Sequence, residues 1–246
     1  LCRAAFTTGR EQQDMLSAAA DVAYLCGWKA YDASEHGLAQ RYYLQAYSLT
    51  REAGDDLHGA WILRILAHNG MDIRRPEHTL DLAEAALDRV RGRLAPAAEA
   101  LFGVTRARAL ANAGRGPEAV AQARAAQDMV VRGEQGEVPS WAALWGTARA
   151  TVSSHTAKTF RALGDHANAE RHYAESARRR PDGTQRITAV TVAAEGREQA
   201  LQGHVEQACD TWGRSLDLLG GVRSARAADE VAGMRRHLRT FEGRGV

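Results

Sequence analysis

The feature that most constrains the fold is a repeated segment in which small residues recur at fixed offsets. The stretch "GLAQRYYLQA", residues 37–46, has counterparts in "EHTLDLAEAAL", "GPEAVAQARAA", "HANAERHYAES" and "HVEQACDTWGRS". Aligned on the small residue that follows each turn, these segments place small side chains at Ala39, Thr79, Ala119, Ala169 and Ala208. A second set lies twelve residues earlier, at Gly27, Ala67, Ala107, Ala157 and Gly196. A third lies seven residues later, at Ala46, Ala86, Ala126, Ser176 and Ser215.

This spacing has a physical cause in the packing of helix pairs. Two antiparallel helices joined by a short turn can approach closely only where both backbones carry little bulk. The twelve-residue offset puts one small residue on each helix at the crossing. The position four residues after the small residue of the second helix is expected to fill the wider gap toward the next hairpin. It holds Tyr43, Tyr173 or Trp212 in three units, and Ala83 and Ala123 in units two and three. The sequence therefore predicts an all-α fold of about five helical hairpins.

The pattern resembles the tetratricopeptide repeat, in which a glycine or alanine stands eighth, an alanine twentieth and another alanine twenty-seventh in the unit. Pro181 also occupies the position of the terminal proline after the fourth unit. The units here are 39 to 50 residues apart, against about 34 in the consensus. The resemblance implies a tetratricopeptide-like superhelix in which longer helices or loops absorb the excess.

The organisation of the chain follows from these repeats. We expect residues 1–16 to form a linker and the start of the first helix, and residues 17–221 to form the repeats. The insertion "RGEQGEVPSW", 132–141, is predicted to be a loop near 132–140, after which Ser140 caps a long helix that runs through Trp141 and Trp145.

The C-terminal residues, 222–246, are predicted to form a capping helix. Within "SARAADEVAGMRRHLRTF", 224–241, the apolar residues near helical spacing are Ala228, Val231, Met234, Leu238 and Phe241. This helix either covers the open end of the stack or pairs with a second copy of the chain, which would give a homodimer.

Composition and motifs exclude several classes of protein. The 32 Lys and Arg against 30 Asp and Glu leave a net charge of +2, without the positive excess of a nucleic-acid-binding surface. Three scattered cysteines favour neither a disulfide framework nor a zinc site and indicate a reducing cytoplasm, and no apolar run approaches the length that spans a bilayer. We expect a cytoplasmic protein that is not an enzyme and has no cofactor, since no GxSxG, P-loop, HExxH or dinucleotide fingerprint occurs.

Other polar clusters carry weaker signals. His166 and Glu170 lie one helical turn apart, but no third ligand completes a metal site. The "RRRPDG" stretch, 178–183, is predicted to be a helix end whose arginines face the helix dipole, rather than a nucleic-acid-binding patch.

The concave face of such a stack is lined mostly by the first helix of each hairpin, and this places the candidate site. The expected groove residues are Tyr24, Trp28, Tyr31, Trp61, Arg64, His68, Arg108, Lys158 and Arg197. One column of this face reads Trp28, His68, Arg108, Lys158 and Arg197. Four of those five side chains can be cationic, so we expect a positive strip that begins at an aromatic pocket. Such a strip suits a peptide or a small acidic effector with a carboxylate.

A structural interpretation of the same residues stays open. Aromatic side chains such as Trp28, Tyr31 and Trp61 commonly pack between hairpins. The basic column could equally be a solvated face whose charge is balanced by Asp21, Asp32 and Asp72.

A narrower resemblance covers most of the chain, from about Ser17 to Phe241. The segments "AYLCGWKAYDASEHGLAQRYYLQAYSLTREAGD", "VPSWAALWG", "FRALGDHANAERHYAES" and "GGVRSARAADEVAGMRRHLRTF" resemble the C-terminal repeat region of helix-turn-helix transcriptional regulators from high-GC Gram-positive bacteria. In that family a Cro/repressor-type DNA-binding domain precedes the repeats. We expect contact with DNA only through such an N-terminal domain, and a start at Leu1 rather than at a methionine is consistent with its removal. The alternative is a stand-alone scaffold that assembles protein partners.

Overall fold

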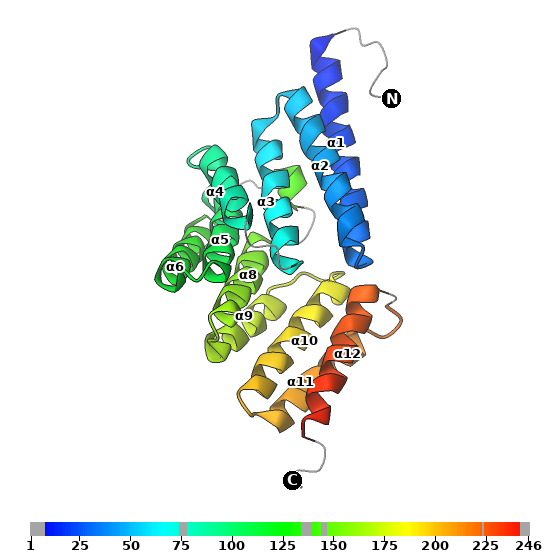
Figure 1. Ribbon diagram of the computed structural model, residues 1–246, viewed down its shortest axis with the longest axis vertical. Helices are drawn as coiled ribbons and strands as arrows, with labels where there is room; N and C mark the ends of the chain where they lie inside the picture. Colours follow the sequence, from blue (N-terminus) through cyan, green and yellow to red (C-terminus); the bar gives the residue numbers. More distant parts are fainter. Residues whose placement is uncertain (1–7, 74–77, 134–138, 144–146, 223, 242–246) are drawn as a thin grey trace.

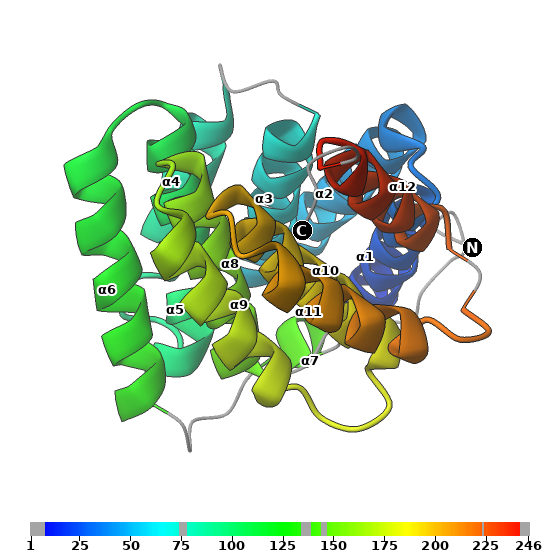
Figure 2. The same cartoon turned by 90° about the horizontal axis from the view of Figure 1, so that it is seen from below.

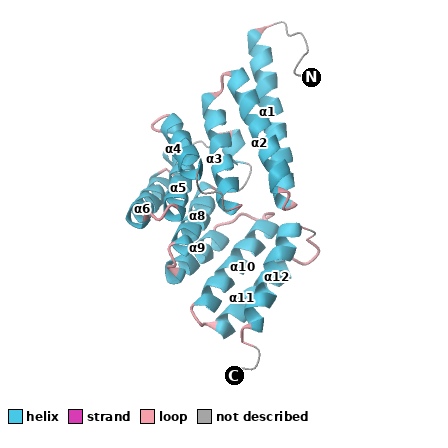
Figure 3. Ribbon diagram, in the orientation of Figure 1, coloured by secondary structure: helices cyan, strands magenta, loops and turns pink. Residues whose placement is uncertain are grey.

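The chain is helical throughout the part that the structure describes, residues 8–73, 78–133, 139–143, 147–222 and 224–241 of a computed structural model. Figure 3 shows helices and loops and, within those residues, no strand. The helices are α1 (Gly9–Asp32), α2 (His36–Ala53), α3 (Asp56–Asp72), α4 (Thr79–Val90), α5 (Pro96–Asn112), α6 (Gly116–Arg132), α7 (Ser140–Ala143), α8 (Ala148–Ala162), α9 (His166–Arg178), α10 (Gln185–Leu201), α11 (Val205–Leu218) and α12 (Ala225–Arg239).

Five helix pairs make up the stack: α1–α2, α3–α4, α5–α6, α8–α9 and α10–α11, with α12 against α10. All fifteen small residues of the repeat pattern are buried. Two of them also tie their hairpins together, because Ser176 Oγ donates to the Ala150 carbonyl (2.7 Å) and Ser215 Oγ donates to the Ala189 carbonyl (2.9 Å). The prediction of an all-α, tetratricopeptide-like superhelix of about five hairpins with a C-terminal helix is confirmed.

Two of the large aromatic residues pack differently from the prediction. A Cβ atom on Gly27 would lie 2.5 Å from the Tyr43 ring, and one on Gly196 would lie 2.7 Å from the Trp212 ring. Tyr43 and Trp212 therefore fill space inside their own hairpins, whereas the prediction placed them in the gap toward the next hairpin. The reason is volume: where the first helix has glycine, the partner helix brings a large ring against its bare backbone.

Four hairpins share one turn conformation. The residue two positions after the first helix has positive φ: Ser34 at 62°, Gly114 at 76°, Gly164 at 76° and Gly203 at 85°. The next residue donates its backbone N–H to the carbonyl five residues earlier at 2.9–3.0 Å, for example from Arg115 to Leu110. These bonds satisfy carbonyls that the helix end leaves free. Positive φ favours glycine, which explains why "NAGRG", "ALGD" and "LQG" mark the turns.

The hairpins coil so that the two ends of the repeat region approach each other. Figure 1 shows α1 and α2 at one end and α10 to α12 at the other, and Figure 2 shows α12 on the same side as α1 and α2. The ends meet at the C-terminus of α1, where Asp32 pairs with Arg186 and accepts a 3.5 Å hydrogen bond from Ser224 Oγ. Ser34 Oγ also donates to Asp229 Oδ2 at 3.2 Å.

Part of the predicted helix from Ser140 through Trp141 and Trp145 is described as helix α7, Ser140–Ala143, whereas Trp145 lies outside the described residues. A new helix begins after Thr147, whose extended backbone and side-chain hydrogen bond to the Ala150 N–H cap α8. Trp141 nonetheless packs into the core, 5.4 Å from the Trp61 ring.

Helix α12 is turned relative to the predicted apolar face. Met234 is buried as expected, but Ala228 is exposed and Ala227 is buried in its place. Met234 packs with Trp212 and small residues of α10 and α11. This orientation directs Arg226 and Glu230 toward the concave side.

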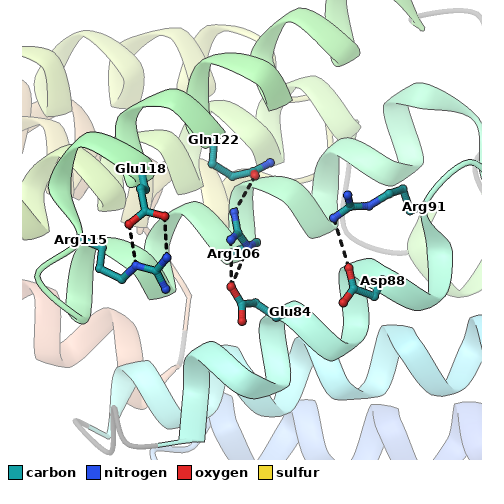
Figure 4. Close-up of polar contacts among 7 residues, drawn as sticks. All are labelled: Glu84, Asp88, Arg91, Arg106, Arg115, Glu118 and Gln122. Atoms are coloured by element: carbon teal, nitrogen blue, oxygen red, sulfur yellow. Dashed lines mark hydrogen bonds and ion pairs between the residues drawn. The ribbon is translucent and has the colours of Figure 1, made fainter.

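The side of the stack around α4 to α6 carries conventional polar contacts. Arg106 of α5 donates to Glu84 of α4 (2.9 Å) and to Gln122 of α6 (3.0 Å), as Figure 4 shows. Arg91 forms an ion pair with Asp88, and Arg115 forms one with Glu118; the two residues of each pair are three positions apart in the sequence. Such solvated pairs contribute little to stability, because water and salt screen the attraction between exposed charges.

Candidate ligand-binding pocket

The curvature of the stack encloses a pocket of about 570 Å³. Its wall comes mostly from α1, α3, α5, α8 and α10, the first helices of the hairpins, together with α12. All nine residues predicted for the groove line this pocket: Tyr24, Trp28, Tyr31, Trp61, Arg64, His68, Arg108, Lys158 and Arg197. A volume of this size suits a small ligand or a few residues of a peptide.

The pocket gathers positive charge in a chain that is nearly neutral. Two acidic side chains, Asp72 and Glu230, stand in its wall. The eight Arg and Lys side chains there are Arg64, Arg108, Lys158, Arg161, Arg180, Arg186, Arg197 and Arg226. Because the whole chain carries only +2, this asymmetry is a property of the pocket and not of the composition.

Asp72 is the centre of the hydrogen bonding in the pocket. Its two carboxylate oxygens accept hydrogen bonds from Arg108 Nη2 and from the Tyr31 hydroxyl, each at 2.5 Å. Burial alone would raise the pKa of Asp72, but the charges of Arg108 and Lys158 hold it well below its usual value. Asp72 is therefore an anion that neutralises one of the neighbouring cations.

His68 belongs to α3 and faces α5. Its Nε2 is 3.2 Å from the Thr105 hydroxyl and its Nδ1 is 3.4 Å from Arg108 Nη1. The ring also contacts His155 edge to face, with centroids 4.2 Å apart. Burial and the neighbouring cations, Arg64 first, lower the pKa of His68 well below 6.5, so its imidazole is neutral at physiological pH.

Lys158 is the cation whose protonation the pocket alters most. Burial first, and then the charge of Arg108, lower the pKa of its amine to about 7. Among the described residues, no carboxylate lies within ion-pair distance of Lys158, Arg64, Arg180 or Arg226. These four side chains provide the unpaired positive charge of the pocket.

The expected cationic column is thus only partly cationic. His68 is neutral, Arg108 is paired with Asp72, and Arg197 lies 3.3 Å from Glu230 and 3.7 Å from Glu198. Lys158 is the one member of the column that is basic and, within the described part of the chain, free of a carboxylate partner. The alternative interpretation was that Asp21, Asp32 and Asp72 balance the charge of the column. Asp72 does so by pairing with Arg108, whereas Asp32 pairs with Arg186 and Asp21 contacts His58, neither of which belongs to the column.

The aromatic residues divide into two kinds. Tyr24 and Trp61 are almost fully buried and form part of the main core, with their rings 6.4 Å apart. Trp28 and Tyr31 are half-buried, and guanidinium groups lie over both rings: Arg186 at 4.8 Å and Arg226 at 5.5 Å. The aromatic wall is therefore interleaved with arginines, and does not form the separate pocket that the sequence suggested.

Four of the eight Arg and Lys side chains in the wall were not expected there from the sequence: Arg161, Arg180, Arg186 and Arg226. Helix α9 ends at Arg178 as predicted for "RRRPDG", but Arg180 continues into the pocket wall, where its buried Nε has no hydrogen-bond partner among the described residues. Arg226 belongs to the helix that was assigned to capping alone. The sequence places Arg226 beside the apolar positions of an amphipathic helix, so Arg226 could have been considered for the site. Only the orientation of α12 shows that Arg226, and not a residue on the other side of the apolar positions, faces the pocket.

The described residues contain no group of three or more His, Cys, Asp or Glu side chains arranged to hold a metal ion. Here His166 and Glu170 have separate partners, with His166 Nδ1 2.8 Å from Glu198 and Glu170 accepting from Gln202 at 2.7 Å. No helix in this part of the chain combines the length and apolarity needed to cross a membrane.

Solved structures with this architecture are tetratricopeptide-like repeat proteins. The Rap protein complexed with Competence and Sporulation Factor matches 94% of this chain at 16% identity with a TM-score of 0.66, and the match covers 62% of the Rap chain. BtubC (BKLC) from P. vanneervenii matches 89% of this chain and 94% of its own at 15% identity, with a TM-score of 0.52. A putative kinesin light chain of Podospora anserina with nearly identical TPR-like repeats matches 84% of this chain and 95% of its own at 13% identity, TM-score 0.52.

These similarities establish the fold class. This chain spans less than two thirds of the length of the Rap chain that it matches. No protein-family model and no curated protein sequence matches it. The chain is a tetratricopeptide-like helical repeat protein with a basic central pocket.

Proposed function

We propose that this chain is a ligand-sensing, protein-interaction repeat domain that binds a peptide or a small acidic effector in its central pocket. The observation that carries the proposal is the concentration of eight cationic side chains against two acidic ones around a cavity of about 570 Å³. An acidic ligand would neutralise charge that the protein itself leaves unpaired at Arg64, Lys158, Arg180 and Arg226.

The pocket holds several of its charges away from water. Arg64 is 3% exposed; its Nε donates to the Leu101 carbonyl (2.9 Å), and its guanidinium lies 4.6 Å from the Trp61 ring centroid. Burial lowers the pKa of Arg64 to about 10. A buried cation without an anion is costly, and hydrogen bonds to charged groups contribute about 1.5–3 kcal/mol each. The same anion should therefore bind with a more favourable free energy in this pocket than on an exposed basic patch.

The experiment that tests the proposal compares two substitutions that each remove one positive charge, one inside the pocket and one outside it. The probes are a library of short peptides with free C-terminal carboxylates, the same peptides amidated, and a panel of di- and tricarboxylates. Binding is measured by calorimetry on the full chain, on Lys158→Gln and on Arg124→Gln, the latter an exposed arginine on α6 outside the pocket wall.

We expect the best free-carboxylate probe to lose about tenfold or more in affinity for Lys158→Gln. Its affinity for Arg124→Gln should match that of the unmodified chain. Equal binding to all three proteins, or a preference for amidated peptides, would overturn the proposal that the pocket recognises acidic ligands.

The wider role that we propose is in a transcriptional regulator. An effector in the pocket would change the curvature of the stack and hence the spacing of attached DNA-binding domains. Support comes from the resemblance of the repeat segments to helix-turn-helix regulators and from the shared fold of the Rap protein, whose structure contains Competence and Sporulation Factor. Residues 1–246 alone should bind operator DNA poorly, and tight sequence-specific binding by this chain would contradict the role.

The second candidate function is a scaffold that assembles other proteins through the same concave surface. The repeat fold favours it as well, because stacked hairpins present an extended interior surface. Reading the codons upstream of Leu1 separates the two functions. A helix-turn-helix pattern there supports the regulator, and an immediate start codon supports the scaffold.

A further inference from the structure

The two ends of the repeat stack are joined by polar contacts between residues far apart in the chain. Asp32, the last residue of α1, accepts hydrogen bonds from Arg186 of α10 and, at 3.5 Å, from the Oγ atom of Ser224, the N-cap of α12. In the turn that follows α1, Ser34 Oγ donates to Asp229 of α12 at 3.2 Å. The partners are 154, 192 and 195 positions apart in the sequence. We call these five residues the clasp.

Within the described part of the chain, no apolar core reinforces the clasp. The main buried cluster joins α1 and α2 to helices as far along as α8, whereas the cluster that contains Trp212 and Met234 belongs to α10, α11 and α12. No buried hydrophobic cluster of the described residues has members from both ends. Burial of apolar surface is the main force that holds packed elements together, and ion pairs in contact with water add little. Separating the two ends would therefore break polar contacts and expose little core.

The repeat architecture concentrates movement at this junction. Each hairpin of a repeat stack contacts mainly its neighbours, so small rotations at successive interfaces add up along the stack. The α1–α2 and α10–α11 hairpins lie at opposite ends of the series, and the summed rotation is largest between them. The clasp is consequently placed where a few contacts restrain the curvature of the whole stack.

The clasp adjoins the pocket on both of its sides. The Arg186 guanidinium lies 4.8 Å from the centroid of the Trp28 ring of α1. One turn along α12 from the clasp residue Asp229, the Arg226 guanidinium lies 5.5 Å from the centroid of the Tyr31 ring. These two arginines and two aromatic residues all line the pocket. Separation of the ends would move the aromatic wall of α1 away from the arginines of α10 and α12, and this would widen the pocket.

We propose that the clasp is a gate, whose contacts hold the two ends of the stack together beside the pocket and separate to admit and release the ligand. The gate rests on the proposed function, since it controls access to the pocket that we assign to an acidic ligand. The side chains of Asp32 and Arg186 keep 17% and 21% of their exposure, so water and salt reach the pair and weaken it. Because Arg186 also lines the pocket, an incoming anion competes with Asp32 for the same guanidinium.

Acetylation of Lys158 measures access to the pocket without any ligand. Lys158, in the pocket wall, and Lys29, exposed on α1, are the only lysines of the chain, so Lys29 is an internal standard. The reagent is N-hydroxysuccinimidyl acetate, and mass spectrometry of peptides reports the rate at each lysine. The reaction is run at about pH 9, where the Lys158 amine, with its pKa lowered to about 7, is mostly uncharged. Changes in the rate at Lys158 then report access and not protonation.

Three variants of the full chain break the clasp: Asp32→Asn, Arg186→Gln and the two together. The matched control is Asp88→Asn on α4, which removes the carboxylate of the exposed ion pair with Arg91, outside the pocket wall. Circular dichroism and thermal unfolding of each variant confirm that it is folded before its acetylation is compared.

We expect acetylation of Lys158 to be about twofold to fivefold faster in each single clasp variant. The double variant should be no faster than the singles, because both substitutions remove the same contact. A salt concentration of about 1 M should accelerate the reaction in the unmodified chain but not in the variants, since salt screens an exposed ion pair. The rate at Lys29, and both rates in Asp88→Asn, should not change.

An unchanged rate at Lys158 in both single variants, or an equal acceleration in Asp88→Asn, would overturn the gate. If acidic peptides still bound in a manner dependent on Lys158, that result would remove the gate alone and leave the proposed function standing. Faster acetylation in the clasp variants, together with no binding of any acidic probe, would count against the proposed function and support the clasp as the gate of the pocket.

Discussion

Replacing Gly196 with alanine tests the close helix packing on which the whole architecture depends. The added Cβ would lie 2.7 Å from Cδ1 and Nε1 of Trp212 and 3.3 Å from the Ala208 carbonyl oxygen. The indole cannot move away freely, because it is 3% exposed and its Nε1 donates to the Ala193 carbonyl at 3.1 Å. Either the two helices separate or the indole loses this hydrogen bond.

The magnitude follows from two opposing effects. Overpacking a well-packed core costs about 1–3 kcal/mol, whereas replacing a helical glycine with alanine gains about 1 kcal/mol of helix propensity. Gly213 on α11 is the matched control, since it is an exposed helical glycine with open space around it. Because the propensity gain is common to both variants, Gly196→Ala should be about 1–3 kcal/mol less stable than Gly213→Ala.

The assay is thermal and urea unfolding of both variants, where about 2–4 °C of Tm corresponds to 1 kcal/mol for a chain of this size. Gly213→Ala should raise Tm, and Gly196→Ala should lower it or leave it unchanged. In a Trp212→Leu background, Gly196→Ala should become neutral or stabilising, which a double-mutant cycle reports as a coupling free energy. If Gly196→Ala stabilises the protein as much as Gly213→Ala does, the reasoning about backbone contact is wrong.

Three further predictions concern charge and assembly. Asp72→Asn should destabilise the protein by about 3–5 kcal/mol near neutral pH, because Arg108 keeps its buried charge without an anion. Since folding lowers the pKa of Asp72 well below its usual value, urea unfolding at a series of pH values should show this difference begin to shrink below about pH 4 and decrease further as the pH falls toward the lowered pKa. Lys158→Met should raise Tm at pH 6–7, because burial and the neighbouring charges lower the pKa of the Lys158 amine to about 7; these charges are Asp72 (α3), Arg108 (α5), Arg226 (α12) and Arg161 on its own helix. Between pH 7 and about 10 the unfolded chain binds more protons than the folded chain, so the gain in Tm should shrink across that window. A gain that stays constant over this range would refute the lowered pKa of Lys158. Leu238 on α12 is 38% exposed, so Leu238→Glu should convert any homodimer to monomer in sedimentation velocity; an assembly that survives the substitution uses another surface.

The hairpin register could be predicted from the sequence because it depends on residues that are near one another in the chain. Gly27 and Ala39 belong to one helix pair and one turn, and their spacing repeats five times. The pattern even encodes volume, since Tyr43 and Trp212 oppose glycines while Ala83 and Ala123 oppose alanines. Ala157 and Tyr173 depart from that rule, so the unit around α8 and α9 combines a methyl group with a large ring.

The electrostatics of the pocket could not be predicted in the same way, because they depend on pairs far apart in sequence. Arg108 is neutralised by a residue 36 positions away, and Arg186 by one 154 positions away. Repeat spacing places each cation on the concave side but does not say which of them meets a carboxylate. The residues of the column do line the pocket, as the sequence predicted. The sequence did not predict which of their positive charges are paired with a carboxylate.

The rotation of α12 accounts for the remaining difference between sequence and structure, and it links the fold to the proposed function. Its apolar pattern allowed several faces to pack inward, and burial of Ala227 with Met234 selects the one that places Arg226 and Glu230 in the pocket wall. There the Arg226 guanidinium lies 5.5 Å from the centroid of the Tyr31 ring of α1, and Glu230 lies 3.3 Å from Arg197 of α10. A helix that only covered apolar surface would make neither contact, so α12 contributes polar side chains to the site that we propose for an acidic ligand.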